Sequence, residues 1–165
     1  MSITEATIQA VLMLWCMNDK HHVYMIPNSN TFLNSSWETD LISVTRAGLC
    51  HEYEIKLNIA DYRRDAKKRK FIWGYLGEQK HAPAYFWYAT SNFKIDPPET
   101  AGWLNIYYNP DRYRWEVDVK KEAPRLNSWK MTEQKQKDAA RLLSWRLAHI
   151  YKNLYLMKKD QSNDN

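Results

Sequence analysis

A short stretch in which charged and apolar residues alternate, HEYEIK at residues 51–56, restricts the possible folds of this chain more than any other segment. Alternation with a period of two is typical of a β-strand, because successive side chains point to opposite faces of a sheet. Glu52, Glu54 and Lys56 therefore share one face, and the apolar residues between them occupy the other. Such a face either forms a ladder of surface salt bridges on an edge strand or arranges charges around a chemical site.

A second β-rich segment comes just before this strand. Residues 39–45 and 49–57 are both rich in strand-forming residues and are joined across 46–48, a glycine-containing link of the kind that closes a hairpin. In that hairpin Asp40, the one acid of a largely apolar segment, approaches Glu54. We therefore expect two carboxylates to converge at one place in a sheet, with the lysine of the same strand beside them.

The remaining elements place this hairpin in an α/β domain. Apolar residues at helical spacing predict a helix over 3–18, which starts at a capping box of residues 2–5, and a long helix over 131–157. A third helix is expected over 60–76. Further strands are expected over 22–26, 84–90, 103–108 and 114–120. The predicted fold is a central mixed β-sheet flanked by helices.

The length of 165 residues suits a single domain over 1–165. We expect its core over about 3–125, followed by the long C-terminal helix and a polar tail over 158–165. One face of that helix is apolar, and its residues are Ala139, Leu142, Leu143, Leu147, Ile150, Tyr151 and Leu154.

The composition argues against a membrane protein or a disulfide scaffold. The sequence has no apolar run of about 18 residues and no signal peptide, so we expect a cytoplasmic protein. Cys16 and Cys50 lack the spacing of a zinc site, which predicts buried free thiols.

The chain is basic, with a formal net charge of +5, and its cations are clustered in residues 61–70, DYRRDAKKRK. Because these cations come directly after the charged strand, they can neutralise the phosphates of a nucleic acid there. The resulting affinity for nucleic acid does not depend on base sequence. A solvated helix face is the alternative explanation. The residues that we expect to contact DNA are Arg63, Arg64, Lys67, Lys68 and Lys70.

The predicted cluster has the chemistry of a divalent-metal site. Mg²⁺ and Mn²⁺ prefer oxygen ligands and keep positions open for water and substrate phosphate. Asp40 and Glu54 supply carboxylates, and the backbone carbonyl of Ile55 supplies a further oxygen. Lys56 is then placed to orient or deprotonate the attacking water and to offset charge in the transition state. We therefore expect Asp40, Glu54 and Lys56 to catalyse phosphodiester hydrolysis with Mg²⁺ or Mn²⁺ and without a small-molecule cofactor.

This pattern resembles the signature of a known superfamily. Asp40, a gap of 13 residues and Glu54-Ile55-Lys56 are similar to the D…(D/E)-x-K motif of the PD-(D/E)XK nucleases, which include restriction endonucleases, junction resolvases and repair nucleases. The resemblance implies a restriction-endonuclease-like α/β fold and a magnesium-dependent nuclease activity on DNA. Thr39 stands where the family usually has proline, and Asn58 stands where it has serine.

The resemblance extends to a smaller group of phage and bacterial proteins of this superfamily that are assigned to DNA repair. It covers residues 3 to about 125 and implies a role in DNA repair, recombination or phage DNA processing, in a bacterial cell or a phage-infected host. The matching segments are 37–41, 52–56, Ala60-Asp61-Tyr62 with Asp65, Lys67 and Lys68, and 101–104.

Four further acids and one histidine are candidates near the metal. In related nucleases a glutamate on the first helix completes the metal site, and Glu5 lies on the same helix stripe as Ile8 and Leu12. The competing interpretation is that Glu5 only closes the capping box. Second-rank candidates, for which a solvated or supporting position is the simpler alternative, are Glu38, Glu52, Asp61 and His81.

Two other functions fit the same sequence. A non-catalytic DNA-binding or repair-accessory module would keep the fold and the basic surface, although it has no need of a cluster formed by Asp40, Glu54 and Lys56. A structural protein would use the long C-terminal helix for dimerisation. The sequence leaves open whether the chain forms a homodimer.

Overall fold

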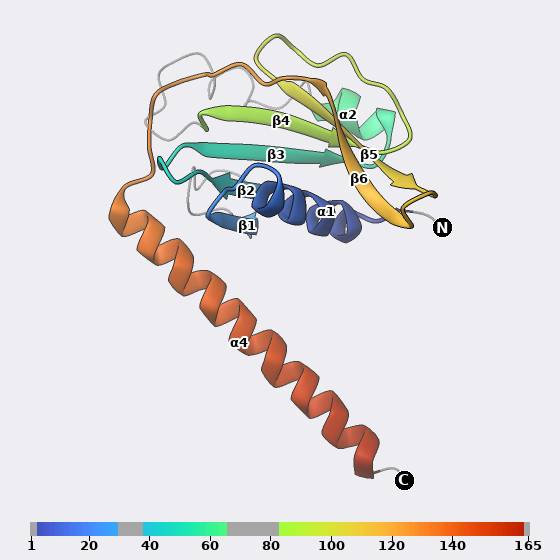
Figure 1. Cartoon of the computed structure of the whole chain (residues 1–165), viewed down its shortest axis with the longest axis vertical. Helices are drawn as coiled ribbons and strands as arrows, with labels where there is room; N and C mark the ends of the chain where they lie inside the picture. Colours follow the sequence, from blue (N-terminus) through green and yellow to red (C-terminus); the bar gives the residue numbers. More distant parts are fainter. Residues whose placement is uncertain (1–2, 30–37, 66–82, 164–165) are drawn as a thin grey trace. The chain divides into compact units, whose positions relative to one another are not determined.

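The computed structural model describes residues 3–29, 38–65 and 83–163, with side chains described as far as Met157. The chain divides into two compact units, Met1–Met131 and Thr132–Asn165. The first contains a mixed sheet with helices on its faces, and the second contains the long helix α4 (Glu133–Asn163; Figure 1). The predicted α/β architecture is therefore confirmed.

The described strands form a six-stranded sheet in which they follow one another in chain order. The pairs β1–β2, β2–β3 and β5–β6 are antiparallel, whereas β3–β4 and β4–β5 are parallel. The predicted hairpin of residues 39–57 is present as β2 and β3, and β3 lies in the interior of the sheet. The strands are β1 (Tyr24–Ser29), β2 (Thr39–Val44), β3 (Cys50–Lys56), β4 (Tyr85–Thr90), β5 (Gly102–Asn109) and β6 (Arg114–Lys121).

A tight turn fixes the register of the β2–β3 hairpin. Gly48 has a φ of 80°, a left-handed conformation that glycine adopts without steric strain, and its N–H donates to the carbonyl of Thr45 at 2.9 Å. The resulting register pairs Leu41 with Tyr53. Continued by one step, it places Asp40 opposite Glu54, as the sequence predicts.

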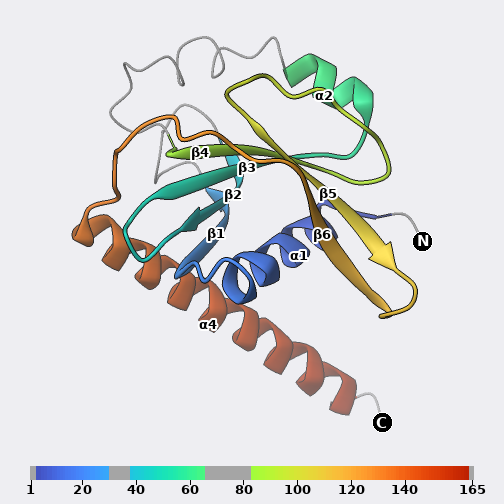
Figure 2. The same cartoon turned by 45° about the horizontal axis from the view of Figure 1, so that its top comes forward.

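Helix α1 (Glu5–Asn18) covers one face of the sheet (Figure 1; Figure 2). Its buried residues Ile8 and Leu12 pack in a cluster with Tyr53 and Ile55 of β3. The helix begins at Glu5 rather than at residue 3, because the side chain of Thr4 accepts the hydrogen bond of the Thr7 N–H. The expectation that Glu5 closes a capping box is therefore wrong.

Both cysteines are free and buried, as predicted. Cys16 donates to the hydroxyl of Tyr53 at 3.3 Å, and that hydroxyl lies 3.2 Å from the hydroxyl of Ser43, which in turn lies 2.6 Å from Nδ1 of His22. His22 is thus a hydrogen-bonded histidine beneath α1, where burial lowers its pKa to about 4. It is part of the packing of this face.

Helix α2 (Ile59–Asp65) lies on the other face of the sheet, directly after β3 (Figure 2). Tyr62 packs edge-on against Tyr88 of β4, and its hydroxyl donates to the carbonyl of Asp96. The predicted helix over 60–76 is present over 59–65, and its remainder lies outside the described residues. The second face of the sheet is therefore covered by α2 and the 91–101 segment, which contributes Ile95 to the buried cluster.

Strand β1 extends beyond the predicted 22–26 into a segment that its Pro and Asn residues mark as a loop. Pro27 has no backbone N–H to donate to a neighbouring strand. It is tolerated because β1 is at the edge of the described sheet. Asn28 has a φ of 47° and lies between Pro27, which pairs with Leu41, and Ser29, which pairs with Thr39. The strand thus continues past a local irregularity.

The second unit contains α4 (Glu133–Asn163), which confirms the predicted long C-terminal helix. Its first turns carry an ion pair between Lys137 and Glu133 at 2.8 Å. Several apolar side chains from the middle of α4 onward are at least half exposed, among them Leu147, Ile150 and Tyr151. Among the described residues, no helix is both long and apolar enough to cross a membrane.

Candidate active site

Glu54 and Lys56 lie at the carboxyl end of β3, on the face that α2 covers. Their side chains are almost completely buried, with 4% and 3% of their surface exposed. β3 is an interior strand between β2 and β4. A ladder of salt bridges on an exposed edge strand, the structural alternative that the sequence allows, is therefore wrong.

Asp40 reaches this cluster from β2. Its Oδ2 accepts a hydrogen bond of 2.6 Å from the backbone N–H of Ile55, so the carboxylate is held against the segment between Glu54 and Lys56. Gln9 of α1, itself buried, holds the backbone at the same point by donating to the carbonyl of Asp40 at 2.9 Å. Two separate contacts thus fix the start of β2.

The charges of other predicted site residues act on the ionisation of Asp40. Burial and, next in size, the negative charge of Glu54 raise the pKa of Asp40 from 3.8 to about 7. Glu5 raises it further, whereas the Ile55 N–H and the charge of Lys56 lower it. The charges of Glu54 and Lys56 on β3 and of Glu5 on α1 therefore all act on Asp40.

Lys56 is held by carboxylates from both β3 and α2. Its Nζ lies 2.8 Å from Oε1 of Glu54 and 3.2 Å from Oδ1 of Asp65, with Oδ2 of Asp61 at 3.9 Å. Asp65 is fully buried, and its Oδ2 accepts from the hydroxyl of Tyr88 at 3.3 Å. Burial, and then the charge of Asp65, raise the pKa of Tyr88. Lys56 is therefore fixed in place by an ion-pair network.

Asp65 is the site residue that the sequence argument missed. It entered only as one position of the family resemblance, although Asp61 and Asp65 are four apart and so share a face of α2. That spacing, placed directly after the Glu-x-Lys strand, is the signal that could have identified it. The second-rank candidate Asp61 does lie near Lys56, but its side chain is 36% exposed.

The other predicted acids take different positions. Glu5 is exposed at the first turn of α1, where its charge still acts on Asp40. Glu38 is exposed and precedes β2. Glu52 is fully buried in β3, where it pairs with Ile42 and Phe86 in the register, so a solvated position for it is wrong.

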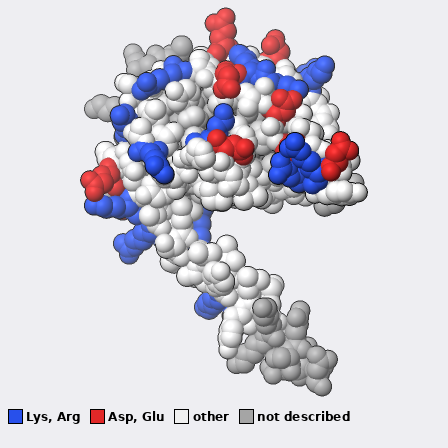
Figure 3. All heavy atoms as spheres, viewed as in Figure 1, with Lys and Arg blue, Asp and Glu red and all other residues white. Residues whose placement is uncertain are grey.

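The predicted DNA-binding residues are described only in part. Arg63 and Arg64 are exposed on α2, and Arg64 lies 3.4 Å from Asp61. The predicted contacts of Lys67, Lys68 and Lys70, and the assisting role of His81, fall outside the described residues. On the face of the molecule drawn in Figure 3, Lys and Arg are interspersed with Asp and Glu.

The carboxylates of the candidate site can be compared with the ligands that a divalent cation requires. In the part of the chain that the structure describes, no three His, Cys, Asp or Glu side chains form a ready-made metal site. Asp40 and Glu54 nevertheless supply two neighbouring carboxylates, and the charge of Glu54 is, after burial, the next cause that raises the pKa of Asp40. Mg²⁺ is commonly held by one or two carboxylates together with water and substrate phosphate.

Comparisons with known proteins bear on the fold. No family model and no curated protein matches the chain. Among solved structures, it is similar to a protein of unknown function from Silicibacter pomeroyi, with 17% sequence identity, a TM-score of 0.58 and coverage of 93% of each chain. At this level of identity the likeness shows a shared fold alone.

Proposed function

We propose that this protein is a metal-dependent nuclease that hydrolyses phosphodiester bonds in DNA. The observation that carries the proposal is that partly buried Asp40 lies beside buried Glu54 and Lys56, where the pKa of Asp40 is raised to about 7. Burying like charges together costs folding free energy, and such costly arrangements are concentrated at functional sites. The same three residues carry the resemblance to the PD-(D/E)XK nucleases.

The roles of the residues follow from their donor atoms. Asp40, Glu54 and the carbonyl of Ile55 would hold Mg²⁺ or Mn²⁺, with Glu5 as the nearest further acid on α1. When bound, the ion supplies a Lewis acid for the phosphate and a water of lowered pKa. Lys56 donates from its Nζ to the attacking water and offsets the charge that develops on the phosphate.

The ion pair with Asp65 holds Lys56 in position even when Glu54 binds a metal ion. Oε1 of Glu54, which now accepts from Lys56, becomes less available to the lysine when Glu54 is used as a ligand. Oδ1 of Asp65, on a separate element and only 3.2 Å from Nζ, still holds the ammonium. The lysine is thus kept at the site by a carboxylate that need not bind metal.

Of the residues expected to contact DNA, Arg63 and Arg64 are the two that the structure describes. Both are exposed on α2, the helix whose Asp61 and Asp65 face Lys56. Guanidinium groups beside the site neutralise backbone phosphates, which positions the strand without reading its bases. The affinity should then fall steeply as salt rises.

Cleavage assays test the proposal directly. The purified protein is incubated with single-stranded, duplex, flapped and branched DNA, with and without Mg²⁺, beside Lys56→Ala and Asp40→Asn. We expect both variants to lose about 100-fold or more of the cleavage rate. Lys120→Ala is the matched control, because Lys120 is exposed on β6 and should leave the rate unchanged.

Each outcome separates the candidate functions. Cleavage that persists in Lys56→Ala removes Lys56 from the mechanism, whatever the wild-type rate. DNA binding without cleavage, in a protein that still binds Mg²⁺ through Asp40, would favour the non-catalytic repair-accessory module. Absence of both DNA binding and Mg²⁺ binding would contradict the proposal.

A further inference from the structure

Helix α4 carries a row of apolar residues with the spacing of a coiled coil. The separations along the row are alternately three and four residues, which keeps the side chains on one narrow stripe of a helix that winds around another. This stripe, called the α4 seam below, consists of Ala140, Leu143, Leu147, Ile150, Leu154 and Met157.

The last four residues of the α4 seam are exposed. Leu147, Ile150 and Leu154 are each half exposed or more, and Met157 is 65% exposed. Single exposed apolar residues are ordinary, but a continuous row of them marks an interaction surface. The regular spacing further specifies the partner, because knobs-into-holes packing requires a second α-helix that runs along the row.

We propose that the α4 seam pairs with the α4 seam of a second copy of this chain. Among the described helices, α1 has already buried its apolar residues Ile8 and Leu12 against the sheet, and α2 is only seven residues long. The α4 seam is complementary to itself, because two copies can place the same three-four spacing face to face.

The residues that flank the seam permit this pairing. Beside Leu147 and Ile150 lie Ser144, Tyr151 and Asn153, which are uncharged, and Arg146. Flanking positions with like charges would repel an identical helix, whereas this stretch brings little charge to the interface. The inference does not depend on the proposed nuclease activity, since no residue of the candidate active site belongs to α4.

Sedimentation of the full-length protein tests the inference. The chain mass is 19.8 kDa, and we expect the wild type to sediment at twice that value at the upper end of an approximately hundred-fold concentration range. Leu147→Asp places a charge in the seam and should raise the dissociation constant at least about 100-fold, leaving a monomer.

Tyr155→Asp is the matched control. Tyr155 is more exposed than Leu147, yet it lies off the seam, so this variant should keep the wild-type mass. Circular dichroism of each variant reports whether α4 remains helical. A wild type that is monomeric over the whole concentration range overturns the proposal, as does equal dissociation of the Leu147→Asp and Tyr155→Asp variants.

Discussion

The ionisation of Asp40 should make the metal-free protein less stable as the pH rises. Its pKa is raised from 3.8 to about 7, so the folded state holds this proton more tightly than the unfolded state. The resulting stabilisation is complete below about pH 4 and is lost as the pH rises through about 7. At 1.36 kcal/mol for each pH unit, the loss is at most about 4 kcal/mol.

Asp40→Asn isolates this effect. Asparagine keeps an oxygen that can accept from the Ile55 N–H, but it does not ionise, so the variant should lack this pH dependence. Urea unfolding is measured without divalent ions at several values between pH 4 and 8. As the pH rises, the free energy of unfolding of Asp40→Asn should increase relative to that of the wild type. At pH 8 the variant should be the more stable of the two.

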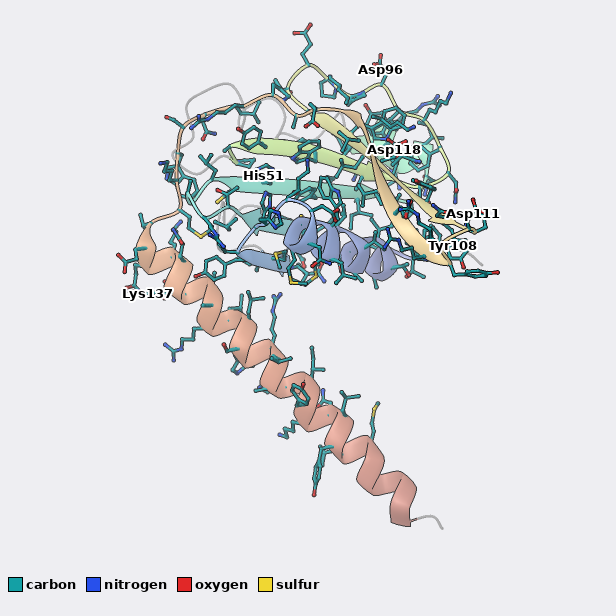
Figure 4. All side chains as sticks on the ribbon, in the orientation of Figure 1. His51, Asp96, Tyr108, Asp111, Asp118 and Lys137 are labelled. Carbon is teal, nitrogen blue, oxygen red and sulfur yellow. The ribbon has the colours of Figure 1, made fainter. Side chains whose placement is uncertain are left out.

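Divalent cations should reverse the difference. At Mg²⁺ concentrations about 100 times the dissociation constant, the wild type should gain about 2.7 kcal/mol, and Asp40→Asn should gain less. Asp111→Asn, on the turn between β5 and β6, is the control and should follow the wild type throughout (Figure 4). Parallel pH curves for the wild type and Asp40→Asn would refute the account of a charge-coupled Asp40.

Two further variants test the site and the core. Asp65→Asn removes a buried charge partner of Lys56 and should lower the free energy of unfolding in urea by about 3 kcal/mol. Asp61→Asn, at the exposed end of the same network, should change the free energy of unfolding by less than about 1 kcal/mol. Equal effects of the two variants would contradict the network. Gly102→Ala would drive a methyl group into the indole of Trp87 and to within 2.7 Å of the Ala123 backbone nitrogen. The variant should lose about 1–3 kcal/mol of folding stability and have a lower thermal midpoint. An unchanged midpoint would show that the neighbouring groups can move to make room.

The hairpin could be predicted from sequence because its signals are local. Period-two alternation over 51–56 and the Gly48 turn fix both the faces and the register, and the register alone brings Asp40 opposite Glu54. The parallel pairing of β3 with β4 is different, since it joins residues more than thirty positions apart. No pattern in either strand specifies that neighbour.

The burial of the site could not be read from the residues. A Glu-x-Glu-x-Lys face resembles a solvated surface, and only the position of β3 inside the sheet, with α2 over it, turns Glu54 and Lys56 into buried groups. Asp65 was missed for the same reason. Its partner Lys56 is nine positions earlier, on another element, and the contact exists only after α2 has folded back over the end of β3.

The network around Lys56 explains how such acids can share a site before any metal arrives. Lys56 lies within ion-pair distance of both Glu54 and Asp65, whereas the carboxylate of Asp40 accepts from the neutral Ile55 N–H. Burial, and then the charge of Glu54, raise the pKa of Asp40 to about 7. A cation that binds at Asp40 therefore acts at the least compensated acid. Binding should release protons at neutral pH and fewer at pH 9, because an ionised Asp40 has none to lose. Calorimetry of Mg²⁺ binding in two buffers of different ionisation enthalpy measures the number of protons released for each ion bound. If that number does not vary with pH, the group that titrates is not Asp40.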